Sequence, residues 1–102
     1  MAQSVPQRRA VSARERGDDR LFQVLQMLAV RPRLEIVLAL LEGEKRVTDL
    51  AAAARITTVG ASQHLAKLRW TGLVVARPTG TQVFYSLNAD RLKELRRLTS
   101  GS

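Results

Sequence analysis

A mainly α-helical domain with one β-hairpin is the fold class that the sequence predicts, and three patterns predict it. Apolar residues recur at helical spacing in about five segments between residues 18 and 98. After Gly72 the spacing changes to two residues, which is typical of paired strands. Only a short turn separates the third helical segment from the fourth. This order of elements predicts a winged helix-turn-helix of the α+β class, with a two-stranded hairpin as the wing.

The two ends of the chain differ in composition from the predicted domain at residues 18–98. Residues 1–17 hold four arginines and few large apolar residues, so we interpret them as a disordered basic tail. An arm that touches nucleic-acid phosphates is the alternative. Residues 99–102 are small and polar, and they are expected to fray.

The first two predicted helices are strongly apolar. Asp18 and Asp19 open the first, because carboxylates suit the positive end of the helix dipole. Its apolar stripe is wider than one buried face needs, so we expect it to pack against both the core and a second subunit. Pro32 suits the first turn of the second helix, and Gly43 suits its end. One face of the second helix is lined by Leu34, Val37, Leu38 and Leu41, with Ile36 and Leu40 alongside.

The third and fourth predicted helices form the helix-turn-helix. Thr48 is expected to cap the third helix, and Thr57 to cap the fourth, which runs to about Arg69. The inward stripe of the fourth helix is Ala61, Leu65 and Leu68. Its outward face is small and polar and includes Gly60, which costs roughly 1 kcal/mol against alanine in a helix interior. Short outward side chains allow a helix to enter a DNA major groove about 12 Å wide.

The hairpin and a last helix complete the predicted domain. The strands are expected at Leu73–Arg77 and Gln82–Leu87, with a turn over residues 78–81, and the helix at Asp90–Leu98. About 80 ordered residues bury only roughly 60–65% of the surface of the unfolded chain, so the apolar first and last helices are expected to pair in a homodimer. The residues predicted to form this dimer are Leu21, Phe22, Leu25, Leu92 and Leu95.

Composition excludes several classes of protein. Lysine and arginine number 17 against 9 acidic residues, and the net charge of +8 favours a polyanionic partner. The chain has no cysteine and one histidine, His64, which excludes disulfides, thiolate metal sites and multi-histidine zinc sites within one chain. The longest apolar run is too short to span a bilayer, and residues 1–17 lack the apolar core of a signal peptide, so we expect a cytoplasmic protein without a membrane partner.

Six segments of the chain resemble the ArsR/SmtB family of bacterial repressors, in the family's order and at its spacing. The segments are Leu28–Leu34, Leu40–Glu44, Val47–Ala51, Ser62–Leu68, Thr71–Val74 and Val83–Leu87. The resemblance covers about residues 21–95 and implies a dimeric winged helix-turn-helix. Such a protein binds double-stranded DNA and releases it when it meets a metal ion or another signal. By symmetry, the expected DNA site is an inverted repeat.

The resemblance also implies DNA contacts on the fourth helix. Gln63 is the expected base reader, because its amide can pair with adenine N6 and N7, while Lys67 and Arg69 suit phosphates. The expected set of DNA-binding residues is Thr57, Thr58, Val59, Ser62, Gln63, His64, Lys67, Arg69 and Arg77. The family's wing turn is commonly rich in basic residues, whereas Arg77 is the one basic residue here, so we expect a weak contribution from the wing.

The signal and the direction of regulation stay open. The family's thiolate site is absent, and the paired site on its last helix is reduced to Ala89-Asp90-Arg91. The alternatives are a non-metal signal, no direct signal, a partner protein, or a divalent ion such as nickel or zinc held by oxygen and histidine ligands. The candidate ligands are Asp18, Asp19, His64, Asp90 and Glu94, for which helix capping and solvation are the alternative roles. Repressor and activator differ only in where the DNA site lies.

An enzyme is not expected, because no nucleophile–base set or phosphate loop is present. A winged helix that contacts only proteins is the main alternative, and it differs in having no sequence-dependent DNA affinity. Trp70 stands where the family usually has a small residue; we expect its indole to cover the base of the wing, with a contact surface for a partner or an apolar effector as the alternative.

Overall fold

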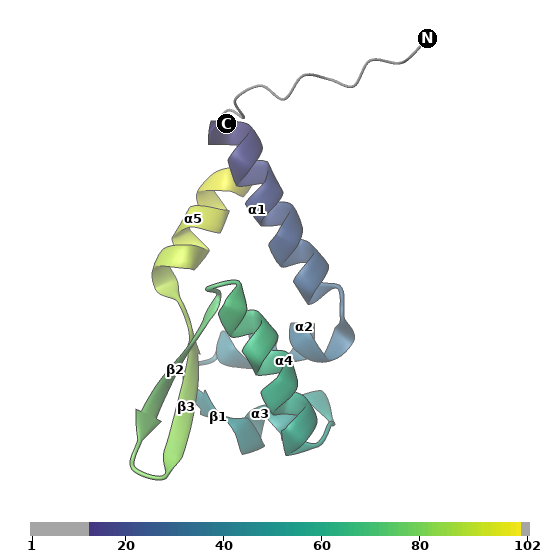
Figure 1. Cartoon of the computed structure of the whole chain (residues 1–102), viewed down its shortest axis with the longest axis vertical. Coiled ribbons are helices and arrows are strands. Elements are labelled where there is room, and N and C mark those ends of the chain that lie inside the picture. The colour runs from purple at the N-terminus through teal and green to yellow at the C-terminus, as the bar shows by residue number, and fades with distance from the viewer. Residues whose placement is uncertain (1–12, 101–102) are drawn as a thin grey trace.

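Five helices and a three-stranded antiparallel sheet follow one another in the computed structural model, which describes residues 13–100 (Figure 1). The elements in chain order are α1 (Ala13–Leu28), α2 (Arg31–Leu40), β1 (Lys45–Arg46), α3 (Val47–Ala54), α4 (Thr58–Trp70), β2 (Val74–Thr79), β3 (Gln82–Leu87) and α5 (Ala89–Ser100). This order confirms the predicted winged helix-turn-helix. None of the helices in the described range is long and apolar enough to cross a membrane.

The core lies where α2, α3 and α4 meet the base of the hairpin. Its most deeply buried large side chains are Ile36, Leu50, Leu65, Leu68, Leu73 and Val74. Figure 1 shows α1 and α5 side by side at one end of the molecule and the β2–β3 hairpin extending at the other end. Helix α4 runs between these two ends. Its position depends on the core, because its buried side chains are part of that core.

Both ends of the domain are longer than the sequence predicts. Helix α1 begins at Ala13, because Ala, Arg and Glu are strong helix formers and the cost of Gly17 does not stop the helix. Residues 13–17 are therefore helical rather than part of the predicted tail, and residues 1–12 lie outside the described range. Helix α5 continues to Ser100, so residues 99 and 100 are helical and residues 101–102 lie outside the description.

The apolar face predicted for α2 is buried only in part. Val37 of that face is buried, together with Ile36 and Leu40, which were placed alongside it. The other residues of the predicted face, Leu34, Leu38 and Leu41, are 38%, 49% and 62% exposed. Because α2 carries apolar residues all around its circumference, helical periodicity alone does not select the side that faces the core.

A short strand, β1, precedes α3 and was not predicted. Lys45 and Arg46 pair with Tyr85 and Phe84, which places β3 in the middle of the sheet. The cap of α3 is also different, because Arg46 occupies the N-cap position and Thr48 lies inside the helix. The Asp49 carboxylate accepts a hydrogen bond from the Arg46 backbone N–H at 3.2 Å. An acidic side chain therefore still lies at the N-terminus of the helix, where it interacts favourably with the positive end of the helix dipole.

The turn and cap before α4 form as predicted. Thr57 Oγ1 accepts a hydrogen bond from the backbone N–H of Gly60 at 3.0 Å, which confirms Thr57 as the N-cap. Ala61, Leu65 and Leu68 are at most 1% exposed, so the predicted inward stripe is confirmed. The helix ends at Trp70, one residue beyond the expected end.

Arg33 forms hydrogen bonds that connect three helices. Its Nε donates a hydrogen bond to Nδ1 of His64 on α4 at 3.2 Å. Its Nη1 donates to the carbonyl oxygen of Met27 at 3.3 Å and to the Met27 sulfur at 2.9 Å. Because Arg33 belongs to α2 and Met27 to α1, one guanidinium links the first, second and fourth helices.

The hairpin has a tighter turn than expected. Strand β2 continues through Pro78 to Thr79, which pairs with Gln82, so only Gly80 and Thr81 form the loop. Gly80 has a φ of +60°, a conformation that glycine adopts without steric cost. The wing is therefore a regular two-residue hairpin.

Replacing Leu68 by alanine should destabilise the domain by about 2–5 kcal/mol, because its side chain is fully buried and nothing refills the cavity. Chemical unfolding at a fixed protein concentration measures this loss. The exposed neighbour Lys67 offers a matched control, and Lys67→Ala should change stability by less than about 0.5 kcal/mol. Equal losses in the two variants would contradict the described orientation of α4.

The stability of the domain should fall as the pH drops below about 6.5. Burial, followed by the positive charges of Arg33 and Lys67, lowers the pKa of His64 from its ordinary value. The unfolded chain therefore takes up a proton at a pH where folded His64 is still neutral, and stability is fully present only above the unfolded pKa. Unfolding across this pH range should show the loss in the natural chain and not in His64→Asn, which keeps an acceptor and does not titrate. The same dependence in both would rule out His64 as its source.

Candidate nucleic-acid interface

The side of α4 opposite its buried stripe is open to solvent. Thr58, Ser62, Gln63 and Lys67 are exposed, and Val59 is 66% exposed. Since successive helix residues are about 100° apart, Val59, Gln63 and Lys67 form the middle of this face and Ser62 lies on its flank. The sequence predicted each of these side chains as a DNA contact, and the structure brings them together on one surface.

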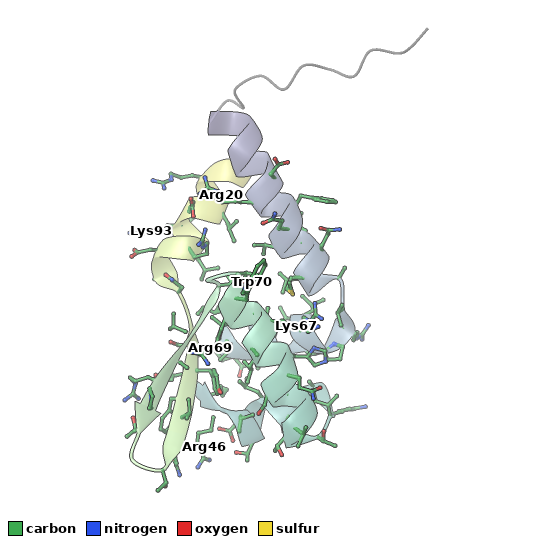
Figure 2. All side chains as sticks on the ribbon, viewed as in Figure 1. Arg20, Arg46, Lys67, Arg69, Trp70 and Lys93 are labelled. Atoms are coloured by element: carbon green, nitrogen blue, oxygen red, sulfur yellow. The ribbon has the colours of Figure 1, made fainter. Side chains whose placement is uncertain are left out.

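The C-terminal half of α4 carries two basic side chains. Figure 2 shows Lys67 and Arg69 on opposite flanks of α4, toward the C-terminal half of the helix. Both side chains are exposed, and neither forms an ion pair with a residue in the described part of the chain. Thr57 is exposed as well, but its hydroxyl oxygen is occupied in capping the helix. The face therefore presents unneutralised cations beside small polar groups.

A groove of about 420 Å³ separates α4 from the wing. Ser62 lines it from α4, Thr81 and Gln82 from the hairpin, and Arg46 and Thr48 from the start of α3. Figure 2 shows Arg46 at the edge of this region, beside the hairpin, where Arg46 pairs with Phe84 of β3. The predicted site residues did not include Arg46, Thr48, Thr81 and Gln82, because the packing of α3 on α4 and the pairing of β1 with β3 bring them beside Ser62. No local pattern in the sequence signals that pairing.

Arg77 on the wing is held against the body of the domain. Its Nη2 and Nε contact the two carboxylate oxygens of Glu44 at 2.7 and 3.0 Å. It also donates to the Thr79 hydroxyl at 2.9 Å, and its guanidinium lies 5.2 Å from the centre of the Phe84 ring. The hydrogen bonds raise the pKa of Arg77 and lower that of Glu44. A predicted DNA contact is thus neutralised within the protomer.

His64 lies on the flank of α4 and is half-buried. Because Nδ1 accepts the hydrogen bond from Arg33, a neutral His64 ring carries its proton on Nε2. The position fits a donor to a phosphate better than a metal ligand, since Nδ1 is already occupied.

The candidate metal ligands do not converge within one protomer. Glu94 is held between Arg20 at 3.0 Å and Arg91 at 2.9 Å, while Asp19 and Asp90 are exposed. The side chain of Asp18 lies outside the description. Among the described residues there is no group of three or more His, Cys, Asp or Glu side chains that could hold a metal ion. The described residues of one protomer therefore form no site that fits a divalent metal ion.

The five residues predicted to form a dimer divide into two groups. Phe22 and Leu25 on α1 are 59% and 55% exposed, so they present an uncovered apolar surface. Leu21 and Leu92 pack against the core of their own protomer, and Leu95 is part of that core. The exposed surface available for pairing is accordingly narrower than predicted.

Trp70 does not cover the base of the wing as expected. Its side chain is 83% exposed at the end of α4, and Figure 2 shows it between α1 and α5, where the hairpin begins. The large residues that follow it, Leu73 and Val74, are only 2% exposed and fill the base of the wing instead.

Comparison with known proteins agrees with the fold. The model of the arsR family of bacterial regulatory proteins matches residues 31–75. The chain is 37% identical over 75 residues to the HTH-type transcriptional regulator KmtR of Mycobacterium tuberculosis, an alignment that covers 74% of this chain and 58% of KmtR. It is 33% identical over 81 residues to the transcriptional activator HlyU of Vibrio cholerae, covering 79% of this chain and 75% of HlyU.

Solved structures extend the comparison. HlyU superposes with a TM-score of 0.71 at 33% identity, covering 83% of this chain and 92% of the HlyU chain. A possible ArsR-family transcriptional regulator from Mycobacterium bovis, solved as a homodimeric winged helix-turn-helix DNA-binding domain, superposes with a TM-score of 0.67 at 33% identity and covers 87% and 86% of the two chains. These relatives are regulators, in agreement with the expectation that the chain is not an enzyme. The chain belongs to the arsR family of bacterial regulatory proteins.

Proposed function

We propose that this protein is a transcriptional regulator that binds double-stranded DNA in a sequence-dependent way as a homodimer. The observation that carries the proposal is the open face of α4, where small polar side chains and unneutralised cations lie opposite a fully buried stripe. A helix with this cross-section fits the major groove, and its buried side fixes which residues face the bases.

Gln63 is the proposed base reader. Its side chain is exposed in the middle of the open face and has no hydrogen-bond partner among the described residues, so both amide groups are available. An amide of this kind can donate to adenine N7 and accept from adenine N6. Thr58 and Ser62 flank it with hydroxyl groups, and the exposed Val59 side chain suits contact with a thymine methyl group.

Phosphate binding is assigned mainly to α4 and to the groove beside it. Lys67 and Arg69 have no carboxylate partner in the described range, so their charges are free to pair with phosphates. His64 supports them with its Nε2–H. Arg77 contributes little, because binding a phosphate would require it to leave Glu44. The wing therefore acts as the wall of the groove more than as a cationic arm.

The proposed dimer joins the exposed apolar side of α1, which includes Phe22 and Leu25, to the same surface of a second copy. A two-fold dimer presents two α4 helices to one side of the duplex, about one helical turn of DNA apart. The expected DNA site is then an inverted repeat. The M. bovis relative is described as a homodimer, which supports this arrangement.

We propose that the protein senses its signal without cysteine ligands, since the chain contains no cysteine. A nickel or zinc ion held between two protomers by oxygen and histidine ligands, a non-metal signal and a co-regulator protein remain the three candidates. Titration of the dimer with nickel and zinc chloride separates the first from the others, because a shared site saturates at about one ion per two-fold interface or per protomer.

Replacing Gln63 by alanine should weaken binding to the preferred DNA site by about 1–3 kcal/mol and relax the choice of base at one position in each half-site. Lys67→Ala should weaken binding to all sequences alike and reduce the salt slope by about one. Sites selected from random DNA, followed by fluorescence anisotropy at several salt concentrations, measure both effects.

The matched control is Lys93→Ala, which removes the same charge from the exposed surface of α5 (Figure 2). It should leave DNA affinity nearly unchanged. If the natural chain shows no sequence preference and little salt dependence, the winged helix serves protein contacts instead, and the proposal fails.

Phe22→Glu should convert the dimer to a monomer without unfolding it, because the side chain is 59% exposed in the protomer and a buried charge at the interface is costly. Sedimentation equilibrium measures the change in mass, and the helical circular dichroism signal should persist. Lys93→Glu is the control for adding negative charge elsewhere. A Phe22→Glu variant that remains dimeric would place the interface on another surface.

A further inference from the structure

Trp70 is an exposed aromatic side chain at the junction of three helices. It is the single tryptophan of the chain, and it is 83% exposed although Leu68 and Leu73 on either side of it are buried. Figure 2 shows its indole projecting from the end of α4 into the angle between α1 and α5. The DNA face proposed above centres on Gln63, two turns earlier in the helix, and does not account for this side chain.

Three hollows lie beside the indole. One of about 580 Å³ lies between the end of α4 and the start of β2 and is lined by Arg69 and Val75. The other two lie on the side of the indole that faces α1. The larger of these two measures about 360 Å³ and is lined by Gln23, Gln26, Met27, Arg33, Trp70 and Thr71. The smaller measures about 180 Å³ and lies between α1, α4 and α5. The larger hollow falls within the range of roughly 300–1,000 Å³ that is typical of small-molecule sites.

The larger hollow has a cation and no anion in its wall. Arg33 forms no ion pair within the described part of the chain, and its Nη2 group has no hydrogen-bond partner there. The side-chain amides of Gln23 and Gln26 also lack partners among the described residues. In the smaller hollow, by contrast, Arg20 and Arg91 are both paired with Glu94. Of the two hollows that face α1, the larger is thus the one with an unused positive charge. Arg69 lines the hollow beside β2, and its charge is already assigned to phosphates.

We propose that the larger hollow binds a small aromatic carboxylate. The indole of Trp70 and the thioether of Met27 supply flat, polarisable surface for a ring of one or two fused cycles. Arg33 Nη2 supplies two N–H donors for the carboxylate, and a charge-assisted hydrogen bond of this type is about twice as strong as a neutral one. The two glutamine amides provide the remaining polar contacts.

The hollow borders the surface proposed for the dimer. Successive residues of α1 are about 100° apart, so Leu25 lies about 160° around the helix from both Gln23 and Met27, whereas Gln26 lies only about 40° from Phe22. A second copy seated on Phe22 and Leu25 therefore approaches the wall of the hollow that Gln26 forms and lies away from the walls that Gln23 and Met27 form.

A carboxylate bound in this hollow would affect the DNA face of α4 through Arg33. The same guanidinium donates its Nε hydrogen bond to His64 Nδ1 on the flank of α4. A carboxylate that draws the guanidinium toward the indole lengthens or breaks this bond, and it thereby changes the restraint on the helix that reads DNA. This coupling rests on the proposed function, whereas the binding site itself does not.

The test follows the single indole N–H resonance of the full chain in NMR spectra during titration with naphthoate. The expected result is a saturable shift. Naphthamide, which keeps the rings without the charge, and acetate, which keeps the charge without the rings, should each bind at least about tenfold more weakly. The absence of a saturable shift with naphthoate at millimolar concentration, or equal binding of naphthamide, would overturn the proposal.

Two variants test the assigned contacts. Arg33→Met should weaken naphthoate binding about tenfold or more, while Arg31→Met on the same helix should not, because Arg31 pairs with Glu35 and does not line the hollow. Trp70→Leu, measured by calorimetry, should also lose affinity and should fold normally, since the indole is largely exposed. Unchanged affinity in both Arg33→Met and Trp70→Leu would overturn the assignment.

The coupling is tested separately by measuring DNA affinity with and without saturating naphthoate. A change of about fivefold or more supports it. Unchanged DNA affinity with clear indole shifts would overturn the coupling and leave the binding site in place. A chain that binds no DNA would overturn the proposed function, while the NMR titration would still decide the site.

Discussion

The burial of one narrow stripe on α4 is the constraint on which the rest of the structure depends. Ala61, Leu65 and Leu68 are at most 1% exposed, and they lie against Leu50 of α3 and Ile36 of α2 in one core. Since a helix has a fixed angular period, burying these three side chains determines the direction of every other residue on α4. Gln63 and Lys67 point outward because Leu65 and Leu68 point inward. The proposed function of the outer face thus depends on packing that touches no ligand.

Arg33 adds a polar restraint to this apolar packing. Its hydrogen bonds to Met27 and His64 connect the end of α1 with the flank of α4 across α2. Polar groups that are only partly buried exchange their partners more readily than a close-packed core rearranges, because water or a ligand can replace the lost bond. The core therefore holds the orientation of α4, while the Arg33 contact offers a place where that orientation can be adjusted.

Sequence patterns could predict those parts of the structure that have a local cause. Thr57 caps α4 because a hydroxyl three residues before a free N–H is a local geometry, and the stripe of α4 follows from a single narrow period. The buried side of α2 was predicted only in part, because its apolar residues surround the helix. Strand β1 is two residues long and shows no period, and Arg77 pairs with Glu44, which lies 33 residues away in the chain. Such contacts exist only once the chain has folded.

The net charge of +8 therefore does not show which basic side chains are available to contact DNA. Arg46 and Arg77 lie near the wing, but each faces a carboxylate, Asp49 at 3.4 Å and Glu44 at 2.7 Å. Exposed pairs of this kind contribute little stability, so their main effect is to cancel positive charge at the wing. Lys67 and Arg69 on α4 have no such partner within residues 19–97. Ion pairing thus cancels positive charge at the wing and leaves it available on α4, which makes α4 rather than the hairpin the centre of the proposed interface.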